Sequence, residues 1–446
     1  MSKKVAFYTL GCKLNFSETA AYSKDFEKNG YEIVPHSEKA DIYVVNTCTV
    51  TEHADKKCRN IIRKFHRQNP DSIIAVTGCY AQLKPKEISD IDGVCFVFGA
   101  QFKKDVVSQV IAFDHEKNGA DNSSTKVSTP VIALKNHSLH GVYSCDTDSI
   151  HDIFSAYSST ERTRAFLKVQ DGCDYQCTYC TIPLARGASR NISIDGLVKE
   201  AEKIASEGTK EIVITGVNTG DFGRSTGEDF LDLLKALNEV DGIERYRISS
   251  IEPNLLREDI IEWIATQVKF VHHFHIPLQS GSDDLLKLMK RRYNTSIFRS
   301  KIDFIRSKMD HVFFGIDVIV GFPGETDELF QETYDFLKDI KPAFIHVFPY
   351  SRRPNTPADL MPNQIDSSVK EERVQKLIEL SNVLHKSFYE ANYGRTEEVL
   401  FENTRKNGMM FGYTRNYIRV KHPYDSSLCG NIISCLLSEN NTTLTL

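Results

Sequence analysis

The stretch AFLKVQDGCDYQCTYCTIPLARG, residues 165–187, joins a strand-length apolar run to a tight group of cysteines. Cys173, Cys177 and Cys180 have the spacing C-x3-C-x2-C and directly follow the run, in the place where βα-barrels build their active sites. A structural zinc ion needs four protein ligands, and no further Cys or His follows the motif closely. Three thiolates on a four-iron cluster leave one iron open, so the motif predicts a cluster that binds a small molecule.

The sequence beyond the motif alternates apolar runs with helical segments. The runs of strand length are 165–170, 211–216, 245–250, 270–279, 312–321 and 343–350. Six βα units predict a complete or partial (β/α)6 barrel. The charged helix 367–394 closes this domain, with Gly394 as its stop signal.

The N-terminal part has the same alternation on a smaller scale. Its apolar runs are 5–10, 41–48, 72–79 and 95–100, and the helix 101–113 follows them. Apolar strands separated by helices predict an α/β domain with a parallel sheet covered on both faces. A polar segment without a clear period comes next, and we interpret it as a linker.

Three cysteines of this N-terminal part lie at or just beyond the ends of predicted strands: Cys12, Cys48 and Cys79. Parallel strands bring their carboxyl ends to one edge of a sheet, so the three thiols are expected to converge in a shared metal site. Each taken alone is better explained as a buried packing residue, and it is the repetition that favours a shared site. The remaining cysteines show no such pattern and are interpreted as structural: Cys58, Cys95, Cys145, Cys429 and Cys435.

The last part of the chain consists of short strand-like runs with turns, which predict a small β-barrel or sandwich. Between Asn403 and Tyr424 it has no acidic residue, and basic side chains alternate with aromatic ones. Basic groups neutralise phosphates and aromatic rings stack on unpaired bases, so this stretch is a candidate RNA-binding surface. The candidates are Arg405, Lys406, Arg415, Tyr417, Arg419 and Lys421. The alternative is a solvated strand face above core tyrosines.

Length and composition set the outer bounds. With 446 residues, the chain is expected to form roughly three domains. We place an N-terminal α/β domain at 1–114, the linker at 115–160, the barrel at 161–390 and the small β-domain at 391–446. A net charge of −5 argues against a simple polycation. Because the sequence shows no signal-peptide core and no membrane span, we expect a cytoplasmic protein without a membrane partner.

The cysteine motif, with the aromatic Tyr179 before its last cysteine, resembles the radical S-adenosylmethionine (SAM) superfamily. That resemblance implies a 4Fe-4S cluster whose open iron binds SAM and, once reduced, cleaves it to a 5′-deoxyadenosyl radical. Segments at the other strand tips are weaker candidates for SAM contacts. Together with Tyr179, the candidate contacts are Gly216, Asn218, Glu252, Gln279, Asp317 and Gly321. His273 and His275 share a strand face, and a hydrogen-bonded pair is favoured over a metal site because no third ligand is evident.

Two three-cysteine sites on one chain are similar to the methylthiotransferases within that superfamily. The motifs that carry this resemblance are TLGCKLN, VVNTCTVT, TGCYAQ, DGCDYQCTYCTIPLARG, LQSGSDDLLKLMKRRY, DVIVGFPGET and HVFPYSRRPNTPA. The first motifs and KVQDGC resemble the bacterial subgroup that acts on N6-threonylcarbamoyladenosine of tRNA. The resemblance implies two 4Fe-4S clusters, and SAM both as methyl donor and as radical source. It also implies a TRAM-like RNA-binding tail.

By the same resemblance, Cys12, Cys48 and Cys79 hold the cluster that handles sulfur, and Cys173, Cys177 and Cys180 hold the cluster that makes the radical. The target is C2 of the adenine at position 37, next to the anticodon. The implied partners are tRNA, SAM, an external electron donor and a sulfur source. Three alternatives stay open: the same chemistry on isopentenyladenosine of tRNA, the same chemistry on a ribosomal-protein aspartate, or an RNA-binding iron–sulfur redox sensor without enzymatic activity.

Overall fold

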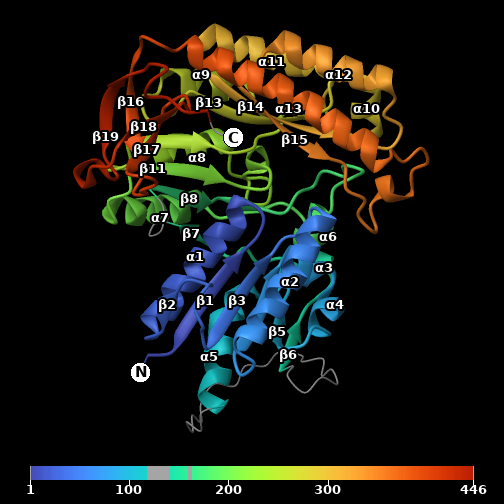
Figure 1. Cartoon of the computed structure of the whole chain (residues 1–446), viewed down its shortest axis with the longest axis vertical. Helices are drawn as coiled ribbons and strands as arrows, with labels where there is room; N and C mark the ends of the chain where they lie inside the picture. Colours follow the sequence, from blue (N-terminus) through green and yellow to red (C-terminus); the bar gives the residue numbers. More distant parts are fainter. Residues whose placement is uncertain (1, 118–139, 159–162, 445–446) are drawn as a thin grey trace.

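The computed structural model describes residues 2–117, 140–158 and 163–444. It places an α/β sheet domain below an open barrel, with a small β-structure at the left of the barrel, beside β11 (Figure 1). No helix within the described ranges is both long and apolar enough to cross a membrane. A large share of the predicted linker 115–160 lies outside the described residues.

The N-terminal domain is built on one parallel sheet with the strand order β2-β1-β3-β4-β5-β6. Its elements are β1 (Lys4–Thr9), α1 (Lys13–Lys28), β2 (Glu32–Val34), β3 (Ile42–Thr47), α2 (Glu52–Gln68), β4 (Ile73–Gly78), α3 (Cys79–Leu83), α4 (Pro85–Ser89), β5 (Val94–Phe98), the 3-10 helix η1 (Ala100–Asp105), α5 (Val106–Lys117) and β6 (Gly141–Tyr143). The four predicted strands are confirmed. Strand β6 lies inside the segment interpreted as a linker, because three residues are too few to show a strand period.

Helices cover both faces of this sheet, as the near-continuous apolar strands predict. Strand β3 shows why, since all six of its residues are buried. On one face α1 and α5 pack through Tyr22, Phe26 and Val110. On the other face α2 and α3 pack through Phe65 and Tyr80. This arrangement fixes the carboxyl ends of β1, β3 and β4 side by side at one edge of the sheet.

The barrel has six parallel strands in an open arc, as predicted. The elements of this part are η2 (Thr147–Ser149), β7 (Tyr157–Ser158), β8 (Arg164–Lys168), β9 (Gln170–Asp171), α6 (Ile182–Arg186), β10 (Arg190–Asn191), α7 (Ile194–Ser206), β11 (Glu211–Thr215), η3 (Thr219–Asp221), α8 (Phe230–Asn238), β12 (Arg245–Ile248), α9 (Glu258–Thr266), β13 (His273–Gln279), α10 (Asp283–Leu288), α11 (Thr295–Lys308), β14 (Phe313–Val320), α12 (Asp327–Ile340), β15 (Phe344–Pro349), η4 (Pro357–Leu360) and α13 (Ser367–Glu390). The strands β8, β11 and β12 join β13, β14 and β15 through a single bridge between Tyr246 and Phe270. The arc does not close between β8 and β15, since β8 pairs with the short antiparallel β7 instead.

Each barrel strand turns alternate residues toward the helices and toward the lumen. The helix-facing residues form the largest apolar core of the chain, for example Leu167, Ile214 and Ile316. The residues between them are largely polar, for example Arg247 and Asp317. The lumen is therefore a polar space inside an apolar wall.

The C-terminal part is an antiparallel sheet with the order β18-β17-β16-β19. Its elements are β16 (Thr396–Phe401), β17 (Met409–Thr414), β18 (Arg419–Pro423), the 3-10 helix η5 (Ser426–Leu428) and β19 (Ile432–Leu436). A bridge between Val420 and Thr442 curls the sheet toward a small barrel, as predicted. Helix α13 ends at Glu390, one turn before the predicted stop at Gly394.

Candidate active site

The cysteines of the C-x3-C-x2-C motif lie in the loop after β9. This loop bends at Gly172, where φ is +78° and any Cβ would lie 2.0 Å from the carbonyl oxygen of Ala188. Burial raises the pKa of Cys173 and of Cys180 to about 12, and it also raises the pKa of Cys177. The free thiols therefore keep their protons at neutral pH, and a bound cation is needed to turn them into thiolates.

Arg291, in the loop between α10 and α11, reaches this cysteine set from across the barrel. Its guanidinium donates hydrogen bonds to Cys177 Sγ at 2.9 Å and to the Tyr179 hydroxyl at 3.2 Å. It also pairs with the carboxylate of Glu252. Two predicted SAM contacts, Tyr179 and Glu252, thus meet beside the cysteines. The sequence did not single out Arg291, because the neighbouring Lys290 and Arg292 carry the same charge.

The loop after β11 holds two further predicted SAM contacts, Gly216 and Asn218. The backbone N–H of Asn218 donates to Gln170 Oε1 at 3.0 Å, which ties this loop to the start of the cysteine loop. Asn218 is buried, yet its side-chain oxygen has no hydrogen-bond partner among the described residues. A buried polar atom without a partner is costly, so this oxygen suits a polar ligand such as SAM.

The remaining predicted SAM contacts lie on β13 and β14. Gln279 stands at a bulge in β13 with φ of +67°. Gly321 follows β14 under Lys370 of α13, whose Cγ would lie 2.3 Å from an added Cβ. Asp317 instead points into the lumen and bonds to His275. Phe322, the residue after Gly321, packs edge-on against the Tyr179 ring, with the ring centres 6.4 Å apart. The assignment of Gln279, Asp317 and Gly321 as SAM contacts stays a prediction.

The three separate cysteines of the N-terminal domain converge as predicted. Cys12 precedes α1, Cys48 follows β3, and Cys79 begins α3 directly after β4. A Cβ on Gly11 would lie 2.7 Å from Cys48 Cβ, so the first two loops are in close contact. Burial raises the pKa of Cys48 to about 12, with further contributions from Cys79 and Cys12.

Both cysteine sets suit an iron–sulfur cluster better than a single zinc ion. Zinc holds sulfurs at about 2.3 Å, which places two sulfurs of a tetrahedral site about 3.8 Å apart. Among the described residues, three ligand atoms within 4.8 Å of one another occur at His275, Asp317 and His346, and at neither cysteine set. The wider spacing and the count of three thiols fit a multi-iron cluster with one open iron.

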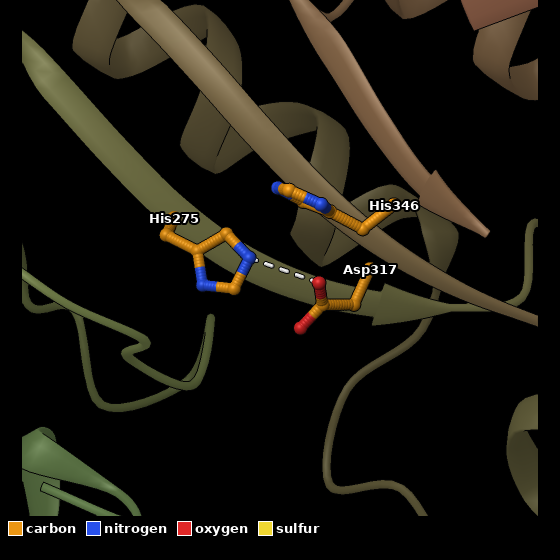
Figure 2. A group of neighbouring side chains, drawn as sticks. All are labelled: His275, Asp317 and His346. Atoms are coloured by element: carbon orange, nitrogen blue, oxygen red, sulfur yellow. Dashed lines mark hydrogen bonds and ion pairs between the residues drawn. The ribbon is translucent and has the colours of Figure 1, made fainter. Parts of the chain in front are cut away.

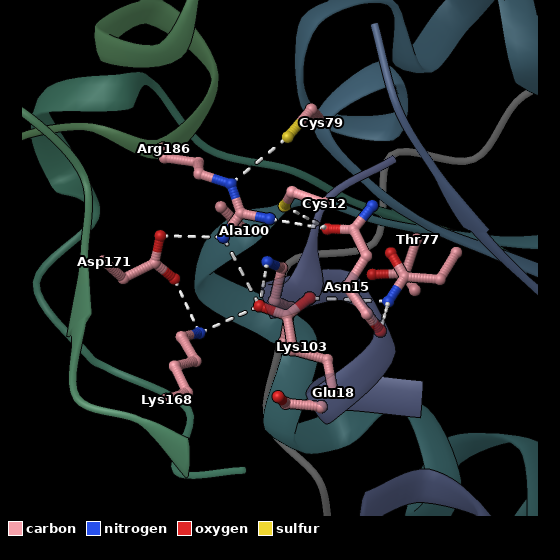
Figure 3. Close-up of polar contacts among 12 residues, drawn as sticks. Cys12, Asn15, Glu18, Thr77, Cys79, Ala100, Lys103, Lys168, Asp171 and Arg186 are labelled. Atoms are coloured by element: carbon pink, nitrogen blue, oxygen red, sulfur yellow. Dashed lines mark hydrogen bonds and ion pairs between the residues drawn. The ribbon is translucent and has the colours of Figure 1, made fainter. Parts of the chain in front are cut away.

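A buried charge network joins the first cysteine set to the barrel (Figure 3). Arg186 of α6 donates to Cys79 Sγ at 3.3 Å, to Asn15 Oδ1 at 2.6 Å and to Asp171 Oδ1 at 2.7 Å. It is 1 % exposed. The helix that follows the second cysteine set thus supplies an arginine to the first set, a contact that the sequence did not reveal.

Glu18 of α1 is the anionic centre of this network. Its carboxylate accepts from Lys103 at 2.7 Å and from Lys168 at 2.8 Å. Burial alone would raise the pKa of Glu18, but Lys103, Lys168 and Arg186 together hold it well below its usual range. Lys168 also pairs with Asp171 at 2.7 Å. Three cations, Lys103, Lys168 and Arg186, therefore face two carboxylates, and Arg186 also donates to the Cys79 sulfur.

A second polar group lies in the lumen, on three neighbouring strands (Figure 2). His275 of β13 and Asp317 of β14 are joined by a bond of 2.9 Å, and His346 of β15 lies beside them. Ser250 Oγ lies 2.6 Å from the other ring nitrogen of His275. His273 is not part of this group, since its ring stacks on Phe313. The sequence offered no further ligands near His275. The structure supplies two potential ligands, Asp317 and His346, from the neighbouring strands.

The predicted RNA-binding residues fall into two sets. Arg415 donates to the carbonyl oxygen of Phe270 at 3.0 Å, and the Tyr417 ring lies 4.8 Å from the guanidinium carbon of Arg247. Both dock the tail on the barrel, because a turn at residues 415–418 directs them there instead of along a strand. The other four stay on the tail's accessible surface: Arg405, Lys406, Arg419 and Lys421.

Comparison with known proteins agrees with this geometry. Residues 4–99 match the family described as "Uncharacterized protein family UPF0004", and residues 167–337 match the radical SAM superfamily. A radical SAM methyltransferase, TsrM from Kitasatospora setae, has a similar fold, with a TM-score of 0.56 at 15% identity over 81% of this chain and 74% of that one. The open barrel and its cysteine motif define a radical SAM enzyme.

Similar full-length proteins narrow this class. The threonylcarbamoyladenosine tRNA methylthiotransferase MtaB of Bacillus subtilis is 40% identical over 96% of this chain and 92% of that protein. The protein of the same name from Aquifex aeolicus is 36% identical over 94% and 96%. The tRNA-2-methylthio-N(6)-dimethylallyladenosine synthase of Alkaliphilus oremlandii is 32% identical over 99% and 91%. The chain belongs to the radical SAM methylthiotransferase family.

Proposed function

We propose that this chain transfers a methylthio group to C2 of N6-threonylcarbamoyladenosine at position 37 of tRNA. The observation that carries the proposal is the pair of three-cysteine sites on adjoining domains, joined through Arg186. One site is needed to generate a radical and another to handle sulfur. Relatives from Bacillus subtilis, Aquifex aeolicus and Thermotoga maritima that are named for this reaction are 40%, 36% and 35% identical to the chain.

A 4Fe-4S cluster with SAM, bound at Cys173, Cys177 and Cys180, would supply the radical chemistry that the unreactive C2–H bond of adenine requires. The residues around it have their own tasks. Arg291, paired with Glu252, would position Cys177 as a cluster ligand by donating to its sulfur. Asn218 offers a buried acceptor for SAM.

Cys12, Cys48 and Cys79 hold the sulfur-handling cluster in this proposal, and Arg186 orients Cys79 by donating to its sulfur. Hydrogen bonds to metal-bound sulfur are known to tune a site's affinity and potential. An external electron donor and a sulfur source complete the reaction, and we place it in the cytoplasm with its tRNA.

The accessible basic residues of the tail serve RNA binding in this proposal. Arg405 and Lys406 are exposed between β16 and β17. Arg419 stacks on Phe411, with the guanidinium carbon 3.9 Å from the ring centre. Such basic and aromatic side chains suit phosphate and base contacts.

A second candidate function is the same reaction on isopentenyladenosine, which is also called dimethylallyladenosine. The observation in its favour is the Alkaliphilus oremlandii relative, which is named for that product and matches 99% of this chain.

Mass spectrometry of nucleosides from bulk tRNA, in cells with and without the gene, tests the proposal. Loss of 2-methylthio-N6-threonylcarbamoyladenosine, with accumulation of the unthiolated nucleoside, is the expected result. Loss of the dimethylallyl product instead would select the second candidate. Unchanged tRNA would contradict both.

A further inference from the structure

Lys13 lies beside the first cysteine set and faces charged groups of the barrel lumen. It follows Cys12 and is the first residue of α1. One turn later, the Ser17 hydroxyl donates to the carbonyl oxygen of Phe166 in β8 at 3.1 Å. Residues four apart share a helix face, so Lys13 faces the barrel at its open edge as Ser17 does.

The ammonium group of Lys13 has no hydrogen-bond or ion-pair partner in the part of the chain that the structure describes, although the residue is half-buried. Other lumen cations are paired: Arg164 with Glu402 at 3.0 Å and Arg247 with Glu211 at 2.9 Å. A half-buried cation without a partner is unfavourable unless a ligand supplies an anion. Lys13 therefore marks a place for a negatively charged group.

The lumen group of His275, Asp317 and His346 lies next to Lys13. Some of its nitrogen and oxygen atoms are free to hydrogen-bond a ligand. No described residue bonds to the ring nitrogens of His346, and Asp317 uses only Oδ1, toward His275. Gly315 leaves room between the imidazoles, because its missing Cβ would lie 3.2 Å from His275 Cδ2. Burial, and after it His275, lowers the pKa of His346 to about 4; Asp317 opposes this shift and Lys13 adds a smaller lowering. The lysine and the imidazole thus border one space.

We propose that Lys13 and the group of His275, Asp317 and His346 form the subsite for the threonylcarbamoyl side chain of the substrate. Lys13 binds its carboxylate, while Asp317 and His346 hydrogen-bond its hydroxyl. This inference rests on the proposed function and names the residues that read its substrate. A dimethylallyl group has neither a charge nor a hydrogen-bonding atom. Its binding would leave the polar side chains of the subsite without partners, so the subsite should discriminate strongly against it.

A divalent metal ion is the competing occupant of the lumen group. His275 already directs one ring nitrogen to Asp317 and the other to Ser250. The unpaired charge of Lys13 next to the group repels a further cation. The same charge attracts a carboxylate.

Binding of three anticodon stem–loop RNAs to the reconstituted holoenzyme tests the subsite. The RNAs differ only at position 37, which carries threonylcarbamoyladenosine, dimethylallyladenosine or unmodified adenosine. Fluorescence anisotropy at one fixed salt concentration gives Kd for wild type, Lys13→Met, Lys13→Arg and His346→Ala. Lys28→Met at the exposed end of α1 is the matched control.

Wild type is expected to prefer the threonylcarbamoyl loop over unmodified RNA. Lys13→Met should weaken binding of that loop about 10- to 100-fold, the usual effect of losing a charged hydrogen bond, and change the other two less than about twofold. Lys13→Arg should retain part of the preference. His346→Ala should reduce it about 3- to 10-fold, and since His346 is on another strand, it tests the subsite independently of α1.

Three results would overturn the subsite. Lys13→Met could keep the full preference. Lys13→Met could weaken the binding of all three RNAs equally, which would mean that Lys13 contacts a phosphate. Elemental analysis could find a stoichiometric metal other than iron that is lost in His346→Ala. Methylthiolation of the dimethylallyl loop alone would instead contradict the proposed function, and that result is independent of the variants.

Discussion

The two cysteine sites are built in opposite ways. Cys173, Cys177 and Cys180 come from one short loop, whose shape depends on neighbouring backbone groups. Cys12, Cys48 and Cys79 follow three different strands, and only the parallel sheet brings them together. The second site is therefore a local structure, whereas the first is a product of the whole domain and of its contact with the barrel.

Each site nevertheless has one arginine that donates to a cysteine sulfur. Arg291 bonds to Cys177 at 2.9 Å and has Glu252 as its carboxylate partner. Arg186 bonds to Cys79 at 3.3 Å from within a network of buried charges. The first site thus depends on a residue from the other domain. A substitution that weakens the domain contact should therefore disturb the first site and leave the second site intact.

Cys177→Ala is expected to have the largest effect. One of three cluster ligands is lost, so SAM cleavage to 5′-deoxyadenosine should fall more than about 100-fold. The measurement is an anaerobic assay with SAM and dithionite on iron-reconstituted protein. Cys95→Ala, a buried cysteine remote from both sites, is the control and should cleave SAM normally. Cleavage by an iron-loaded Cys177→Ala protein would refute the assignment of the second site.

Cys48→Ala should separate the two sites. SAM cleavage should stay within about threefold of wild type, because the second loop does not depend on β3. Methylthiolated RNA, measured by mass spectrometry of the digested product, should be absent. If this variant still makes product, then the first site does not handle sulfur, and the comparison of the two sites fails.

Glu18→Gln tests the domain contact. It leaves Lys103, Lys168 and Arg186 buried without their shared anion, which should lower the free energy of unfolding by about 3–5 kcal/mol. Chemical denaturation measures this. Glu38→Gln, which removes an exposed carboxylate 3.8 Å from Lys4, should cost less than about 1 kcal/mol.

The same network predicts a pH dependence. The pKa of Glu18 is held well below its usual range in the folded chain, so its contribution to stability is present above the unfolded-state pKa of about 4.3. That contribution is lost as the pH falls below this value toward the folded-state pKa. Glu18→Gln should therefore lose less stability than wild type on acidification, and an equal loss in both would mean that Glu18 is not the group responsible.

The sequence predicted both cysteine sites because their signals are local. The spacing within Cys173–Cys180 is visible in one loop, and Cys12, Cys48 and Cys79 each follow an apolar strand. The arginines and the lumen group were not predictable in this way. No local pattern in the sequence marks Arg186, Arg291 or His346, and only tertiary packing places them at the sites. The turn at residues 415–418 was not predicted for a related reason. Tyr417 has a positive φ of 66°, and this stretch has no glycine to indicate a turn.

Arg186→Lys should have the smallest effect of these substitutions, and it compares iron binding at the two sites most directly. Lysine keeps the charge but lacks the fork that bonds Cys79, Asn15 and Asp171 at once, so the first site should hold iron about 10- to 100-fold less tightly. Iron retained against a chelator is measured in two backgrounds, each lacking the cysteines of one site. The loss should appear only where the first site is intact.

Arg190→Lys is the control for this prediction, because Arg190 bonds to the backbone oxygens of Arg186 and Ala188 and to no cysteine. Iron loss at both sites in Arg186→Lys would mean that the arginine stabilises the cysteine loop as a whole. Loss at neither site would mean that the sheet alone positions Cys79. Loss confined to the first site would establish that the radical-SAM domain completes the sulfur-handling site of its neighbour.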